Sequence, residues 1–238
     1  MSATGTLHLI PVTLGGGDPA AVLPAAALAT VRALGDFVVE NEKSARAFLK
    51  QAGHPLPIAT LNLQRLDEHT KTEAVEPLLA PLLAGRSVGL LSEAGSPAVA
   101  DPGAALVAAA HARGIRVQPH VGPSAILLAL MGSGMNGQQF AFHGYVPVPE
   151  AERRKRIHDL ERAAAGGATQ IFIETPYRTD ALLKALLEHC RPETRLCLAV
   201  DLTLPDESIA TRTVAEWRRA APAVGRRPAV FLLGAPRR

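Results

Sequence analysis

Residues 87–114 read SVGLLSEAGSPAVADPGAALVAAAHARG and show most clearly how this chain folds. The short apolar run Ser87–Leu91 is followed by the loop Ser92–Gly103 and by an alanine-rich helix, Ala104–Arg113, which ends before a glycine. A strand, a loop and a helix in this order are typical of parallel α/β architecture. The loop is longer than the roughly two to six residues that usually join a strand to a helix, which indicates a functional role. Asp101, placed before a proline, is expected to cap the helix.

The same alternation of apolar runs and helical segments continues on both sides of this stretch. On its N-terminal side we expect strands at Leu7–Val12, Phe37–Glu40 and Ile58–Leu61 and helices at Pro24–Leu34, Glu42–Gln51 and Glu73–Leu83, with a fifth strand at Ile115–Pro119. Beyond Gly122 we expect a helix at Ser124–Met131, a charged helix at Ala151–Ala164, and strands at Phe140–Gly144, Gln170–Glu174, Arg195–Asp201, Ile209–Val214 and Ala229–Leu233. Because the later strands are closely spaced, an antiparallel part is expected there. The sequence predicts two α/β domains, 1–120 with a mainly parallel sheet and 121–238 with a mixed sheet.

Composition excludes several classes of protein. Of the 238 residues, 47% are hydrophobic and 20% charged, as in a globular protein and unlike a disordered one. No apolar run approaches the roughly 20 residues of a membrane span, and Met1–Thr6 lacks the features of a secretory signal, so we expect a cytoplasmic protein with no membrane contact. With 4% aromatic residues, few rings remain for stacking on bases. The net charge of +3 leaves the partner open.

Neither cysteines nor histidines suggest a metal site. Cys190 and Cys197 are too few for a disulfide framework, have no zinc-ligand spacing and are interpreted as buried structural thiols. The histidines have no metal-ligand spacing either and are interpreted as structural: His8, His54, His69 and His120. The sequence therefore predicts no bound metal.

A glycine-rich loop, Gly15–Pro19, follows the first expected strand. Gly15, Gly17 and Ala20 fit the G-x-G-x-x-A dinucleotide fingerprint, and Glu40 stands where the ribose-binding acid would be, which suggests an NAD-dependent oxidoreductase as one alternative. Against it, the Asp-Pro pair of this loop falls where the phosphate-binding helix should begin. A tight structural turn is a further alternative.

Taken together, three loops carry a resemblance to a known family. The motifs are Leu91–Pro97 with Ala100–Gly103, then Gly122–Ala125, with weaker ones at 142–147, 172–178, 202–203 and 213–217. In this order and spacing the chain resembles the tetrapyrrole methylase superfamily, and within it the branch that methylates the 2'-O-ribose of small-subunit ribosomal RNA. The motifs extend over nearly the whole chain.

That resemblance implies two α/β domains with S-adenosylmethionine in the cleft between them, and a homodimer. By analogy the cofactor-binding residues are Leu14, Gly15, Glu93, Ala94, Gly95, Ser96, Ser124 and Ala125. Small residues suit this ligand, since adenosine and methionine present many hydrogen-bonding edges and little charge to exposed backbone.

If the acceptor is a ribose hydroxyl, a base would help to remove its proton, and the motifs offer Glu93 and Glu174. Each carboxylate has another interpretation. Glu93 would only bond backbone or cofactor, and Glu174 would only orient Tyr177 or Arg178.

Two segments depart from the family pattern. The family usually has an Asn-Leu pair and a following Asp-Ile-Thr where this chain has Gly15–Pro19, and Glu-Asp-Thr-Arg where it has Glu40–Lys43. A small acceptor such as a corrin precursor therefore stays open, as does a non-catalytic nucleic-acid module. The basic run Arg153–Arg156 suits either RNA phosphates or a solvated helix face.

Overall fold

The computed structural model describes residues 4–67, 69–70 and 75–236. The chain divides into two compact units, Met1–Ser124 and Ala125–Arg238, and each has its own sheet and its own buried core. The domain bounds expected from the sequence, 1–120 and 121–238, stay a prediction. Within the described residues, no helix combines the length and apolar character that crossing a membrane requires.

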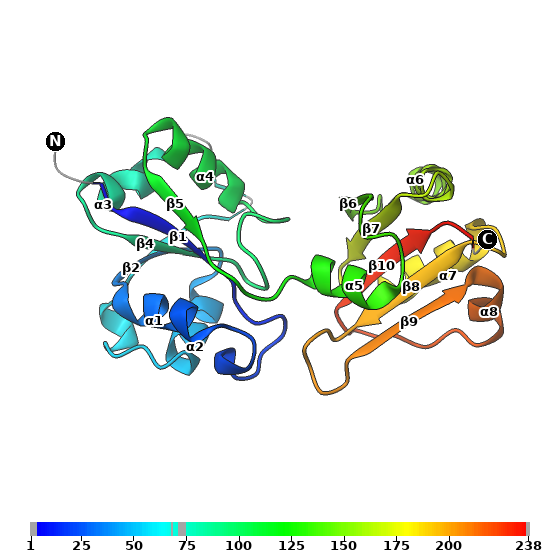
Figure 1. Ribbon diagram of the computed structural model, residues 1–238, viewed down its shortest axis with the longest axis horizontal. Helices are drawn as coiled ribbons and strands as arrows, with labels where there is room; N and C mark the ends of the chain where they lie inside the picture. Colours follow the sequence, from blue (N-terminus) through cyan, green and yellow to red (C-terminus); the bar gives the residue numbers. More distant parts are fainter. Residues whose placement is uncertain (1–3, 68, 71–74, 237–238) are drawn as a thin grey trace. The chain divides into compact units, whose positions relative to one another are not determined.

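In the first unit, parallel strands form a single sheet (Figure 1). Their order is β3 (Asn62–Arg65), β2 (Asp36–Val39), β4 (Val88–Leu91), β1 (Thr6–Ile10) and β5 (Arg116–Pro119), and every neighbouring pair is parallel. The prediction of a mainly parallel first sheet is therefore confirmed. Because all carboxyl ends lie at one edge, the loops after β1, β2, β4 and β5 share that edge.

Helices cover both faces of this sheet. On one face lie α1 (Ala25–Ala33) and α2 (Glu42–Gln51), and on the other lie η4 (Glu76–Leu79), α3 (Ala80–Leu83) and α4 (Gly103–Ala112). Successive side chains of a strand point to opposite faces of the sheet, and β2 follows this rule. Phe37 and Val39 join the α1–α2 core, whereas Val38 joins the α3–α4 core. A strand buried on both faces reads as a continuous apolar run, which is why β2 and β4 were predictable.

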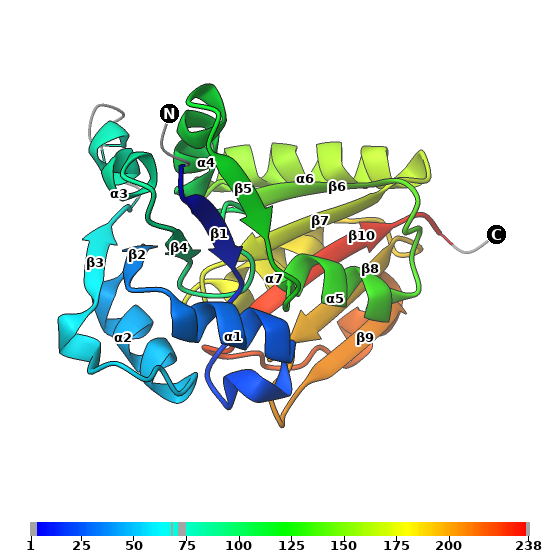
Figure 2. The same ribbon diagram turned by 60° about the vertical axis from the view of Figure 1, so that its left-hand side comes forward.

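The second unit contains a mixed sheet (Figure 2). Its order is β6 (Phe140–Tyr145), β7 (Thr169–Glu174), β10 (Ala229–Gly234), β8 (Arg195–Val200) and β9 (Ser208–Thr213). Only the β6–β7 pair is parallel, and the remaining pairs are antiparallel, as predicted. The core on one face is covered by α6 (Glu150–Ala165), α7 (Thr179–His189) and α8 (Val214–Arg219), whereas α5 (Ala125–Ser133) packs against β8, β9 and β10 from the other face.

Two parts of the sequence-based assignment are wrong. The strand expected at Ile58–Leu61 is a 3-10 helix, Ile58–Thr60, that begins after a proline, and the true strand β3 follows it as a polar, partly exposed edge. The helix α7 was not predicted, although it carries a buried apolar stripe. The helix expected at Glu73–Leu83 appears as η4 and α3, while its residues 73–74 lie outside the described part of the chain.

Gly89, in the middle of β4, is required by a close contact in the first core. A Cβ atom there would lie 2.7 Å from Cδ1 of the buried Phe37 and 3.1 Å from Cδ1 of Ile10. We predict that Gly89→Ala lowers the free energy of unfolding by about 1–3 kcal/mol, since a packed ring cannot withdraw without strain. The matched control is Gly35→Ala, at an exposed position of the same unit where a Cβ meets nothing within 4 Å. Urea unfolding measures both, and equal stabilities would contradict this packing.

Candidate active site

A pocket of about 260 Å³ lies beyond the carboxyl ends of β1, β2 and β4. Its lining comes from the loops after these strands and from α2: Val12, Thr13, Gly15, Gly16, Ser44, Ala45, Ala47, Phe48, Gln51, Ser92, Glu93 and Ala94. Three of the predicted cofactor-binding residues, Gly15, Glu93 and Ala94, belong to this lining. The carboxyl edge of a parallel sheet is also where ligands bind in open α/β folds.

The loops after β1 and β4 are joined by their backbones. The Val12 N–H donates to the Gly95 carbonyl at 2.9 Å, and the two residues form an isolated antiparallel bridge. Gly95 has φ +72°, a left-handed conformation that favours glycine, and a Cβ on it would lie 3.0 Å from Cδ2 of Leu14. The Ser92 hydroxyl donates to the same Gly95 carbonyl at 3.1 Å. Leu14 and Gly95, both predicted from sequence, therefore meet here.

The loop after β5 joins the same edge. The Ser96 hydroxyl donates to the Pro123 carbonyl at 3.2 Å. At Gly122 a Cβ would lie 2.4 Å from Cβ of Pro11, so only glycine allows this approach of the two segments. Ser124 is the last residue of the first unit, and Ala125 is the first residue of α5 in the second. The predicted loops thus converge within the first unit.

Glu93 is exposed and lines the pocket. Its N–H donates to the Glu40 carboxylate at 3.2 Å, and its own carboxylate lies 3.3 Å from the hydroxyl of Ser44. Asn41 caps α2 by accepting from the Lys43 N–H at 2.9 Å, which places Ser44 in the first helical turn. Glu40 and Ser44, on either side of this cap, therefore hold Glu93 in position.

Glu174 has a different environment, in the second unit. It lies buried at the end of β7, and its Oε1 accepts from the Thr175 N–H at 2.7 Å and from the Arg178 Nε at 3.0 Å. The Arg178 Nη2 donates to the same oxygen. This oxygen already accepts from the backbone and from the guanidinium, which leaves it little capacity to accept from a substrate hydroxyl. The geometry supports the interpretation that Glu174 orients Arg178.

Unusual backbone conformations mark the long loop after β4. Ala98 and Ala100 have φ values of +65° and +63°, which cost energy for residues with a side chain. The Asp101 Oδ1 holds this conformation by accepting from the Ala98 N–H at 2.7 Å and from the Gly103 N–H at 2.8 Å. Asp101 thus bonds the first N–H of α4 as predicted, although Pro102 occupies the N-cap position itself. Its Oδ2 is buried without a partner in the described structure, and burial raises the pKa of this carboxyl.

The glycine loop after β1 lacks the geometry of a dinucleotide site. Asp18 accepts from the Ala20 N–H at 2.9 Å and caps the short 3-10 helix Pro19–Ala21, and α1 begins only at Ala25. A pyrophosphate site needs a helix N-terminus directly after the glycines. In addition, the Glu40 carboxylate binds the backbone of Glu93. The fingerprint match at Gly15 is therefore one of spacing only.

Sequence reasoning missed two features of the first unit. Ser44, Phe48 and Gln51 line the pocket from α2, and the only available signal was the helix cap after β2. The Nδ1 of His8 lies 3.0 Å from the Nε2 of His120, and partial burial lowers the pKa of both imidazoles.

Among the described residues no group of three metal-binding side chains occurs, and Cys190 and Cys197 are buried with raised thiol pKa values.

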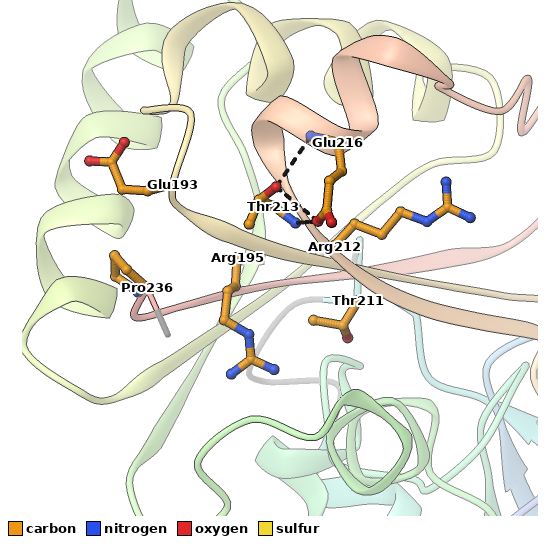
Figure 3. A pocket seen from close by; sticks show the side chains of 7 residues that line it. All are labelled: Glu193, Arg195, Thr211, Arg212, Thr213, Glu216 and Pro236. Carbon is orange, nitrogen blue, oxygen red and sulfur yellow. Dashed lines mark hydrogen bonds between the residues drawn. The ribbon is translucent and has the colours of Figure 1, made fainter. Parts of the chain in front are cut away.

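A smaller pocket of about 180 Å³ lies in the second unit (Figure 3). The Thr213 and Glu216 side chains there form the capping box of α8, and the Arg212 guanidinium lies 4.7 Å from the centroid of the Trp217 ring. Figure 3 shows the guanidinium groups of Arg195 and Arg212 pointing in different directions. Because the arginines diverge and two glutamates also line the pocket, it is no anion clamp.

The basic run on α6 divides into two kinds of residue. Arg153 donates to the Val148 carbonyl at 3.5 Å, and Arg156 lies 2.8 Å from His143 Nδ1. Arg154 and Lys155 are exposed. Only these last two are available to a phosphate without breaking an existing bond.

The raised pKa of Asp101 gives stability a specific pH dependence. Asp101→Asn keeps the accepting oxygen and removes the charge. The folded protein binds this proton more tightly than the unfolded chain does. We therefore predict a difference in unfolding free energy, native protein minus Asp101→Asn, that falls as the pH rises from 3.8, the ordinary pKa of aspartate, through the raised pKa. Urea unfolding at several pH values measures this difference, and a difference that stays constant or rises would refute the assignment.

Comparison with known proteins places this chain in a family. The model of the family "Tetrapyrrole (Corrin/Porphyrin) Methylases" matches residues 6–217. A protein of Xylella fastidiosa named ribosomal RNA small subunit methyltransferase I is 33% identical over 216 residues, which are 90% of this chain and 75% of that protein. The protein of the same name from Mesorhizobium japonicum is 42% identical over 147 residues, 62% of this chain and 49% of its own. The chain thus spans between half and three quarters of these relatives.

Solved structures show the same fold. The methyltransferase CobJ has a TM-score of 0.63 at 22% identity, with 98% of this chain and 95% of CobJ covered. Uroporphyrin-III-C-methyltransferase from Thermus thermophilus has a TM-score of 0.57 at 21% identity, with 97% and 92% covered. The fold and the family model agree with the motifs of the three converging loops. The chain belongs to the tetrapyrrole (corrin/porphyrin) methylase family.

Proposed function

We propose that this chain is an S-adenosylmethionine-dependent methyltransferase and that the pocket of the first unit binds part of the cofactor. The observation that carries this proposal is the convergence of the loops after β1 and β4 on a pocket lined by glycine, alanine and serine. Family membership supports the same activity. The predicted cofactor residues Ser124 and Ala125 remain part of the proposal, which rests for them on the family motif.

The lining has the chemistry that the cofactor needs. Gly15, Gly16 and Ala94 are exposed and present backbone groups to the pocket, and Glu93 offers a carboxylate to a hydroxyl or ammonium group. When bound, the cofactor supplies a methyl group on a sulfonium sulfur. Because the positive charge disappears as the methyl group moves, positioning by the protein contributes much of the catalysis and no metal is required. Gly95 keeps the loop backbone in place beside Leu14.

For the acceptor we propose a ribose 2'-hydroxyl of small-subunit ribosomal RNA. The names of the relatives support this choice, and Arg154 and Lys155 supply exposed positive charge for phosphates. Glu93 is the preferred base, since it lines the pocket whereas Glu174 is bound to Arg178. As the resemblance implies, we expect a homodimer, and we propose a cytoplasmic location.

The alternatives have less support. A methylase of a corrin or porphyrin precursor shares the family, but the similarity to CobJ extends to the fold alone. An NAD-dependent oxidoreductase would need a helix after the Gly15 loop, where the chain has a 3-10 turn. A non-catalytic nucleic-acid module would need no pocket at the carboxyl edge.

Substitutions on the loop after β4 test the cofactor site. Ala94 lines the pocket, whereas Val99 is 49% exposed on the same loop and does not. We predict that Ala94→Phe fills the pocket and weakens binding of S-adenosylmethionine and S-adenosylhomocysteine at least tenfold, while Val99→Phe stays within about twofold of the native protein. Gly95→Val is less suitable, since φ +72° and the contact with Leu14 would disturb the loop itself.

Isothermal calorimetry measures both ligands and NADH on the three folded proteins. Equal binding by Ala94→Phe would remove this pocket from the cofactor site. Binding of NADH without S-adenosylmethionine would refute the proposed activity.

A further inference from the structure

Tyr177 is an exposed aromatic side chain in the turn between β7 and α7, with 77% of its surface accessible. The Arg226 guanidinium lies over its ring at 5.1 Å from the centroid. We propose that Tyr177 and Arg226 form a stacking site for an unpaired nucleobase of the RNA substrate. The inference rests on the proposed RNA acceptor and adds to it a contact that recognises single-stranded RNA.

Hydrogen bonds to Asp180 fix the backbone just before Arg226. Asp180, in the first turn of α7, accepts from the Val224 N–H at 2.8 Å and from the Gly225 N–H at 3.1 Å. Val224 is buried in the core of the second unit, and Gly225 has φ +67°. Because a buried anchor and a glycine turn precede Arg226, its position over the ring does not depend on the ring alone.

The topology of the sheet brings both residues to one edge. Ala229, the first residue of β10, pairs with Glu174, the last residue of β7. Residues shortly after β7 and shortly before β10 must therefore lie at the same end of the sheet. Val200 of β8 pairs with the same Ala229, and Asp201 directly after it has φ +51°. A left-handed aspartate at this edge is the kind of strained conformation that gathers at functional sites.

Charge distinguishes Arg226 from its neighbours. Arg178 is paired with Glu174, and Arg227 with Asp201 at 3.3 Å. Arg226 is exposed, and no carboxylate within the described ranges forms an ion pair with it. Two arginines at this edge are thus neutralised by buried acids, whereas the one that lies over an open ring keeps its charge for a ligand.

This combination suits a nucleobase with its phosphate. A base stacks on the face of a tyrosine whatever its identity, and a neighbouring guanidinium adds a cation–π contact or binds the phosphate. The low aromatic content of the chain does not oppose the proposal, since a single exposed ring suffices for one base.

The test compares two RNAs of small-subunit sequence. One is a hairpin with an unpaired loop, and the other is a duplex of the same stem in which every base is paired. Tyr177→Ala is expected to weaken binding of the looped RNA about 5- to 100-fold and to leave the duplex unchanged, because only an unpaired base can stack. Tyr177→Phe, which keeps the ring, should bind within about twofold of the native protein. Arg226→Ala should weaken binding and reduce the salt slope by about 0.7–0.9.

Arg219→Ala is the matched control, because Arg219 is an exposed arginine of the same unit at the end of α8. It should bind the looped RNA within about twofold of the native protein. Sedimentation and calorimetry with S-adenosylmethionine show whether each variant keeps its assembly and its cofactor site.

Several results would overturn this site. If the native protein binds looped RNA and Tyr177→Ala binds it equally, the stacking contact is wrong while the proposed function stands. If Tyr177→Ala instead changes the sedimenting species, the ring belongs to a protein interface. If the native protein binds the cofactor but neither RNA, the RNA acceptor fails and the stacking site fails with it.

Discussion

The hydrogen bond from the Val12 N–H to the Gly95 carbonyl joins the loops after β1 and β4, and the arrangement of the candidate site depends on it. Gly95 adopts a left-handed φ of +72°, which favours glycine, and a Cβ atom there would lie 3.0 Å from Cδ2 of Leu14. From that contact follow the position of Leu14 against Gly95 and the bond from Ser92. The pocket walls at Gly15 and Ala94 are set by the same bridge.

Holding this edge in place has an energetic cost that local bonds offset. Left-handed alanines at 98 and 100 are unfavourable, and they persist because Asp101 accepts two backbone N–H groups within the same loop. The partly buried ion pair Glu174–Arg178 has a comparable role in the second unit. Such pairs add little net stability but fix the direction of a side chain. Both units therefore use hydrogen-bonded acids, Asp101 before α4 and Glu174 at the end of β7, to fix irregular loops.

How much of this was predictable depends on how local the determining signal is. The apolar run at 88–91 predicts β4, and the glycine after α4 predicts the end of that helix. Both signals are local, because burial on both faces and helix termination depend on a few neighbouring residues. Strand β3 escaped prediction because an edge strand needs no apolar run, and the prolines before it gave the 3-10 helix at Ile58 its form. The α7 helix was not predicted, although its apolar residues have helical spacing and therefore indicate a helix.

The candidate site shows the same division. Motifs identified Glu93, Ala94 and Gly95, because small residues in a long loop are visible in one segment of sequence. Ser44 and Phe48 join the pocket from a helix about 50 residues away, and His8 meets His120 across 112 positions. No local pattern encodes those contacts, since they arise only when β1, β2, β4 and β5 take their places in the sheet. The stacking of Arg226 on Tyr177 likewise needs the pairing of β10 with β7.

The central claim is that this chain transfers the methyl group of S-adenosylmethionine to ribosomal RNA, and methyl transfer is its most direct measurement. S-adenosylmethionine labelled in the methyl group is incubated with the purified protein and either small ribosomal subunits lacking this modification or a porphyrin precursor. The account predicts label in the RNA. Nuclease digestion should place the label on a ribose 2'-oxygen, and the label should stay with the ribose when the bases are removed. Label in the porphyrin precursor alone, or bound cofactor with no transfer to either acceptor, would contradict it.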